Sequence, residues 1–141
     1  MSKRKYKNPK KGYKNLTPFF KMFFAKFGFY EIEGKGKPYY MGTKQGKVFR
    51  VTASNKLKEM KDGSTEKKYG YVKLKMPDGT FKEFAVHRLN GQFIENPENK
   101  PLVHHETGKK NHNAIDELAW ATYKENALYY QQSKKRKDWS I

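Results

Sequence analysis

Phenylalanines recur at helical spacing near the beginning of the chain. Thr17 and Pro18 precede them as a helix N-cap and a proline at the first helical position, and Gly28 ends the segment. The aromatic residues between these signals are Phe19, Phe20, Phe23, Phe24 and Phe27. The pattern predicts one short amphipathic helix whose aromatic face packs in a core or against a partner, because apolar residues at helical period are mainly buried.

The chain then alternates between β-forming runs and turn residues. Three aromatic and β-branched runs are separated by glycines and predict a small antiparallel sheet. These runs are residues 29–32, 38–41 and 47–51. Further on, residues 69–76 alternate with period two, Pro77-Asp78-Gly79 supplies a turn, and residues 80–86 return, which predicts a β-hairpin.

The last part of the chain has a different order of elements. Arg88 and Leu89 open a short helical turn, and the Asn- and Pro-rich residues 96–101 form a loop. Two brief strands follow, separated by a polar loop, and Thr122 and Glu125 then provide a capping box that starts a helix. The strands are residues 102–105 and 118–121, the loop is residues 106–113, and the helix runs into residues 127–130. The whole pattern indicates an α+β protein.

The net charge of the chain indicates what kind of molecule it binds. The 141 residues contain 31 Lys and Arg against 14 Asp and Glu, a formal net charge of +17, which favours a polyanion and nucleic acid before a membrane. Residues 1–14 contribute seven of these charges and the run from Lys134 to Asp138 contributes three, so ten of the seventeen lie at the two ends. Such ends bind phosphate, solubilise a protein or thread into an RNA–protein assembly.

Other features exclude several functions and locations. The chain has no cysteine, which excludes disulfides, cysteine-ligated zinc and thiol catalysis. Residues 19–27 are too short and too interrupted by lysine to span a bilayer, and no signal-type apolar stretch follows Met1. We therefore expect a cytoplasmic protein that is not secreted and has no membrane partner.

Histidines gather around the polar loop. His104, His105 and His112 are three of the four histidines in the chain, and Asn126 lies on the first turn of the helix that follows. An imidazole and a carboxamide oxygen suit a divalent ion, and a second imidazole can take a proton from water. From the residues alone, a pair of surface histidines in a hydrogen-bonded turn is an equally good explanation.

Longer motifs extend this pattern. The ordered residues are Val86-His87-Arg88-Leu89, Asn96-Pro97-Glu98-Asn99-Lys100-Pro101, Val103-His104-His105, Gly108, Asn113, Leu118, Trp120, Thr122 and Glu125-Asn126. Their order and spacing resemble those of the HNH homing endonucleases of phages, and two upstream runs resemble the nuclease-associated modular segment that often precedes them. Those runs are residues 28–32 and 46–51. The resemblance covers about residues 28–130 and implies a ββα-metal nuclease module after a small antiparallel sheet segment.

The resemblance also implies roles for individual residues. His105 matches the general base that activates water, while His104 and Asn126 match the positions that ligate one divalent ion, usually magnesium or manganese. His87 and Arg88 match the family's His-Arg-Leu run, for which packing and a surface phosphate contact are the expected roles. Duplex DNA is the implied partner, and the host cell infected by a phage is the implied location. The residues expected to contact DNA are Lys3, Arg4, Lys5, Arg50, Arg88, Lys109 and Lys110.

Several positions depart from the family pattern. Thr107 stands where the family has Asp, and Glu106 stands where an apolar residue is usual. Glu117, which we count with the catalytic residues, replaces the Asn that braces the loop carrying the base; near His105 its charge would favour imidazolium. His104 is uncharged and softer than the usual ligand, so a softer transition metal is possible.

Two hypotheses about function follow. The first is a metal-dependent DNA endonuclease of the homing type that nicks one strand or cuts both. The second is a catalytically degenerate, HNH-derived scaffold that binds DNA or RNA or is part of a particle. In both, the expected division is a basic flexible tail at 1–14, a helix and β segment at 15–80, the HNH module at 81–133 and a basic C-terminal tail at 134–141.

Overall fold

The computed structural model of the chain describes residues 20–139, with side chains up to residue 132. Thr17, Pro18 and Phe19, predicted to begin the aromatic helix, lie outside the described residues. Residues 20–25 are helical, and Gly28 follows with a φ of +86°. Only glycine adopts this left-handed conformation without strain, so the predicted end of the helix is confirmed.

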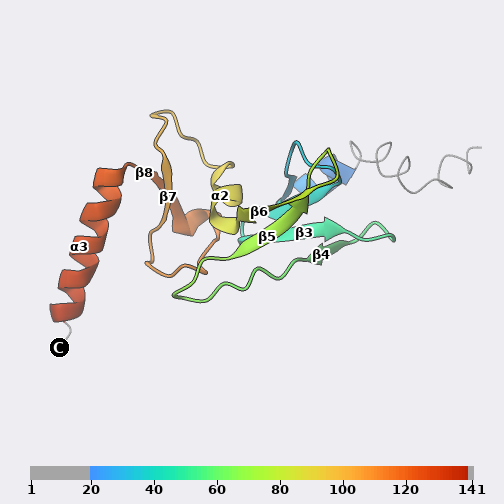
Figure 1. The fold of residues 1–141 in the computed structure, drawn as a ribbon. Helices are drawn as coiled ribbons and strands as arrows, with labels where there is room; N and C mark the ends of the chain where they lie inside the picture. Colours follow the sequence, from blue (N-terminus) through green and yellow to red (C-terminus); the bar gives the residue numbers. More distant parts are fainter. Residues whose placement is uncertain (1–19, 140–141) are drawn as a thin grey trace, which may run out of the picture.

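Within residues 20–139, eight strands form three antiparallel groups (Figure 1). The first is a four-stranded sheet in the order β1-β2-β3-β4, the second is the hairpin β5-β6, and the third is the ribbon β7-β8. The strands are β1 (Phe29–Glu31), β2 (Tyr39–Gly42), β3 (Lys47–Val51), β4 (Leu57–Glu59), β5 (Tyr71–Lys75), β6 (Phe81–Ala85), β7 (Leu102–His105) and β8 (Leu118–Ala121). Besides the helical residues 20–25, the described helices are α2 (Val86–Gly91), the 3₁₀ turn η2 (Ile115–Glu117) and α3 (Tyr123–Trp139). The predicted α+β class is therefore confirmed.

One strand has no counterpart in the sequence prediction. β4 is three residues long, two of them charged and exposed, and it pairs with β3 through Arg50 opposite Lys58. A run this short and polar has no periodicity to mark it as a strand. It is extended because β3 supplies its hydrogen-bond partners.

A hydrophobic core joins the sheet, the hairpin and α2. Its buried side chains are Ile32, Tyr39, Met41, Val48, Val72, Leu74, Val86 and Leu89. The alternating burial of β5 places Val72 and Leu74 in this core, as the period-two pattern predicts. The Tyr39 hydroxyl also accepts the backbone N–H of Lys75 across 2.9 Å. Residues on both sides of the predicted boundary at 80/81 therefore share one core, and the division into four segments stays a prediction.

The ribbon β7-β8 and α3 lie at the end of the molecule opposite the four-stranded sheet, with α2 between them (Figure 1). The predicted capping box is confirmed, because Glu125 accepts the N–H of Thr122 at 2.9 Å and Thr122 accepts the N–H of Glu125 at 3.0 Å. α3 runs on to Trp139, so it includes basic residues assigned above to a C-terminal tail. No helix within residues 20–139 is long and apolar enough to cross a membrane.

Candidate functional site: a histidine-lined cleft

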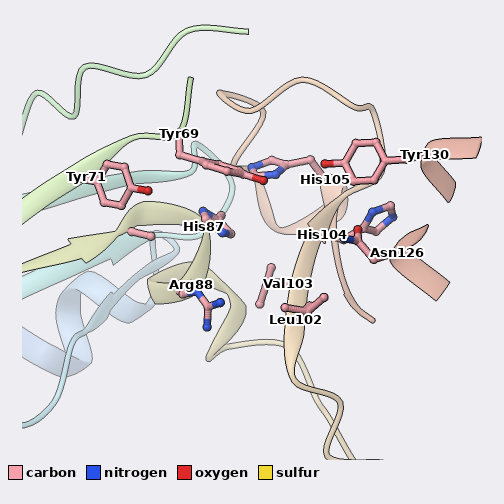
Figure 2. Close-up of a pocket in the computed structure, with 11 residues that line it drawn as sticks. Tyr69, Tyr71, His87, Arg88, Leu102, Val103, His104, His105, Asn126 and Tyr130 are labelled. Carbon is pink, nitrogen blue, oxygen red and sulfur yellow. The ribbon is translucent and has the colours of Figure 1, made fainter. Parts of the chain in front are cut away.

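A cleft of about 390 Å³ opens between the hairpin end with α2 on one side and β7 with α3 on the other. Figure 2 shows the residues that line it. Tyr69 precedes β5, His87 and Arg88 come from α2, His104 and His105 end β7, and Asn126 and Tyr130 come from α3. The cleft therefore unites the two predicted histidines and Asn126 with side chains from earlier in the chain.

His105 is held in one orientation by Asn113. β7 places His105 opposite Leu118 of β8, and its side chain is only 7% exposed. Its Nε2–H donates to Oδ1 of Asn113 across 2.7 Å, so Nδ1 keeps its lone pair. Burial lowers the pKa of His105 below its ordinary value, and the hydrogen bond to Asn113 offsets part of that shift. His105 is thus neutral near pH 7, which is the form that accepts a proton.

Three rings pack together at the inner wall of the cleft. The centroids of Tyr69 and His87 are 4.8 Å apart, those of His87 and His105 are 4.9 Å apart, and Tyr69 lies 5.7 Å from His105. Burial, and then the charges of His105 and Arg88, lower the pKa of His87 to about 4. Its Nδ1 is buried and has no hydrogen-bond partner among the described residues. Packing was the expected role of His87, and its place beside His105 in the cleft was not predicted.

The Glu117 carboxylate contacts residues other than His105, although its position in the motif is that of the residue that supports the loop carrying the base. Its carboxylate accepts the N–H of Ala114 at 3.2 Å and lies 3.3 Å from Nδ1 of His112. The contact to Ala114 caps the η2 turn, which is a local structural role. Its charge acts to raise the pKa of His105, as the sequence argument supposed, but burial outweighs it. Asn113, which the motif includes but to which no role was assigned, makes the direct contact with His105.

His104 and Asn126, the two residues expected to ligate a divalent ion, lie in the same cleft. They line the same cleft from β7 and from the first turn of α3, and neither side chain makes a hydrogen bond to another described residue (Figure 2). The His104 ring also packs edge-on against Tyr129, with centroids 4.3 Å apart. A neutral nitrogen and a carboxamide oxygen suit manganese or a softer transition metal better than magnesium. Within the described chain, no cluster of three or more His, Cys, Asp or Glu side chains could hold an ion.

The predicted DNA contacts are distributed unevenly. Arg88 lines the cleft, and the Lys110 ammonium lies 4.6 Å from the centre of the Tyr69 ring. Lys109 forms an ion pair with Glu66 at 3.1 Å, and Arg50 lies on β3 outside the cleft. The other predicted contacts, Lys3, Arg4 and Lys5, lie outside the described residues. Of the predicted DNA contacts, Arg88 therefore lines the cleft and Lys110 lies next to it, against Tyr69.

Comparisons with known proteins agree with the motif. No protein-family model matches the chain. An uncharacterized HNH endonuclease of Acanthamoeba polyphaga mimivirus is 34% identical over 93 residues, which are 64% of this chain and 27% of the relative. A solved structure of the HNH homing endonuclease I-HmuI, described for its DNA binding and cleavage, is similar with a TM-score of 0.62 and 28% identity, over 76% of this chain and 59% of that one. The chain thus spans about a quarter of the curated relative and about three fifths of the structural relative. The predicted resemblance to HNH nucleases and the HNH type of α+β fold are both confirmed.

Proposed function

We propose that this chain, which shares the HNH nuclease fold, is a metal-dependent endonuclease that hydrolyses phosphodiester bonds of duplex DNA, in the manner of a homing enzyme. The observation that carries the proposal is the state of His105. It lies at the cleft wall, Asn113 fixes its Nε2–H, and Nδ1 is left as an acceptor. A neutral, oriented imidazole is what a general base near pH 7 requires.

The chemistry follows from this geometry. Nδ1 of His105 takes a proton from water while the water oxygen forms a new bond to phosphorus. The bond from phosphorus to the leaving 3′ oxygen breaks, and that oxygen takes a proton from solvent, so one P–O bond forms and one is lost. Arg88, at the edge of the same cleft, binds a phosphate oxygen and holds the strand in place. One active cleft cuts one strand.

His104 and Asn126 are the residues that would hold the divalent ion. When bound, the ion neutralises charge that develops on the phosphate and on the leaving oxygen. Water and phosphate oxygens would have to complete its ligands, because the described residues hold no cluster of three or more His, Cys, Asp or Glu side chains that could bind an ion. Manganese suits the pair better than magnesium, because the imidazole nitrogen of His104 is a softer ligand than the carboxylate oxygen that magnesium prefers.

Duplex DNA is the proposed substrate because the net charge is +17 and because the structural relative is described as binding and cleaving DNA. On the four-stranded sheet, Arg50 stands directly opposite Lys58. Like charges on neighbouring strands destabilise a sheet, and a phosphate between them removes that cost. We therefore expect this pair to contact DNA beyond the cleft, together with Lys3, Arg4 and Lys5 of the N-terminal segment.

Nicking of supercoiled plasmid tests the proposal. The protein should convert it to the open circular form with manganese and should stop when a chelator is added, whereas the His105→Ala variant should nick far more slowly while it still binds the plasmid. Equal conversion by both proteins, or conversion that persists in chelator, would contradict the assignment.

A second function is favoured by a specific observation. The two metal-ligand candidates are neutral, and Thr107 and Glu117 depart from the family pattern. A scaffold that binds DNA or RNA without cutting it would keep the charged surface and show no metal-dependent nicking. Tight duplex binding with no product at any divalent metal would favour this alternative.

A further inference from the structure

Asn90 is a fully buried polar residue at the end of α2. Its side chain is 0% exposed, and both protons of Nδ2 are donated to backbone oxygens. One goes to the carbonyl of Thr43 at 3.1 Å and the other to the carbonyl of Asn113 at 2.6 Å. A single amide thus joins the turn after β2 to the loop that supports His105.

The turn after β2 also contacts the loop that contains Asn113 through backbone atoms. The N–H of Ile115 donates to the carbonyl of Thr43 at 2.8 Å. Gly46 has a φ of +69°, and a Cβ atom built on it would lie 2.3 Å from the carbonyl carbon of Asn113. No side chain fits between them, so the turn fixes the position of the Asn113 backbone.

Packing alone does not explain an asparagine at position 90. Its Oδ1 is buried and has no hydrogen-bond partner among the described residues, which is a cost that an apolar side chain of similar size would avoid. The gain that accompanies this cost is the pair of directed bonds from Nδ2. Such bonds select one arrangement of two backbone segments, whereas apolar contact tolerates small displacements.

We propose that Asn90 is a positioning residue for His105, acting through Asn113, and that the turn of residues 43–46 is part of the active site. Asn90 and the turn hold the Asn113 backbone, the Asn113 side chain accepts Nε2–H of His105, and the Nδ1 lone pair therefore faces one direction. The four-stranded sheet thus contributes to catalysis as well as to binding. The predicted effect on the rate of DNA nicking rests on the proposed function, whereas the predicted effect on the tautomer of His105 does not.

The test uses Asn90→Asp, which keeps the size of the side chain and replaces its donor with an acceptor. Nitrogen-15 NMR of the imidazole reports whether His105 holds its proton on Nε2. In the unmodified protein we expect that tautomer alone, and in the variant a mixture of both. If the chain nicks DNA, kcat should fall on the order of 10²-fold, the scale of a displacement of about 1 Å in an active site, while the KM for DNA stays unchanged.

Asn96→Asp is the matched control. Asn96 makes the same kind of bond, from Nδ2 to the carbonyl of Lys100 at 2.9 Å, in the loop before β7 and away from Asn113. The control should leave the His105 tautomer unchanged. A mixture of tautomers in both variants would show a general loosening of the fold and would overturn the proposal.

Two further outcomes keep the inference separate from the proposed function. If the unmodified protein does not nick DNA, the tautomer still decides whether Asn90 positions His105. If Asn90→Asp does not fold, Asn90→Ser retains one donor and should show a partial shift toward the second tautomer. An unchanged tautomer in a folded Asn90 variant would overturn the proposal whatever the activity.

Discussion

The Nε2–H of His105 and the side-chain oxygen of Asn113 are joined across 2.7 Å inside a cleft wall where His105 is 7% exposed. This bond selects one tautomer of the imidazole and presents the other nitrogen as an acceptor. Its partner lies on the long polar loop between β7 and β8, so the shape of that loop decides how the candidate base is oriented.

Removal of the base should slow the chemical step strongly and leave DNA binding intact. His105→Ala should lower the rate of plasmid nicking on the order of 10²–10⁴-fold, the usual contribution of general acid–base catalysis, with little change in the Kd for duplex DNA. His112→Ala removes a histidine that does not line the cleft and serves as the control. Nicking at the same rate by the His105 variant would mean that another group activates the water.

Variants of Asn113 and Glu117 should show which residue orients the base and which one stabilises the loop. Asn113→Ala should reduce the nicking rate strongly, because it removes the acceptor for His105. Glu117→Gln should have a small effect on rate and lower the free energy of unfolding by about 1 kcal/mol, since it weakens the cap on Ala114. Rate measurements and denaturant unfolding of both variants check this. A larger loss of rate in Glu117→Gln than in Asn113→Ala would show instead that Glu117 orients the loop that carries the base.

The metal preference should follow the charge of the ligands. Asn126→Ala and His104→Ala should raise the manganese concentration needed for half-maximal nicking, because each removes a ligand and not the base. His104→Asp introduces a charged oxygen ligand and should shift the preference toward magnesium. Electron paramagnetic resonance of free manganese measures binding without reference to activity. Identical manganese affinity in all four proteins would place the ligands elsewhere.

His87 should make the fold sensitive to mild acid. Its pKa is about 4 in the folded chain and 6.5 in the unfolded chain, so the unfolded chain binds more protons between these values. Stability should therefore be constant above about pH 6.5 and fall as the pH drops toward 4, by up to about 3 kcal/mol from this group. The groups that face it are Tyr69, His105 and Arg88.

The His87→Gln variant should lose much of this slope when urea unfolding is measured at several pH values. Part of the slope should remain, because burial also lowers the pKa of His105. His112→Gln controls for removal of a histidine outside the ring cluster. A slope unchanged by His87→Gln would show that His87 does not titrate in this range.

The N-terminal segment should contribute salt-dependent, sequence-independent affinity. Deletion of residues 1–14 removes seven basic side chains and no acidic one. Binding to all duplexes should weaken alike, and the slope of log K against log salt should decrease by about 0.9 for each lost phosphate contact. Fluorescence anisotropy at several salt concentrations, on duplexes of different sequence, measures both quantities. A truncated protein with the same affinity and slope would show that the segment serves something other than DNA.

The sequence by itself determined the local elements of this protein. The alternation in β5, the turn before β6 and the exchange of bonds between Thr122 and Glu125 involve residues near one another in the chain, so their pattern is visible without a fold. The motif spacing likewise located His104, His105 and Asn126, and the structure brings these three residues into one cleft.

Only the tertiary structure decided what surrounds them. The Asn90 amide reaches Thr43, 47 positions earlier, and Asn113, 23 positions later, while Tyr69 and His87 meet His105 from separate elements. β4 likewise exists because β3 pairs with it. Such contacts depend on how the sheet, the hairpin and the ribbon pack together, and the periodicity of a single segment carries no information about a partner so far along the chain.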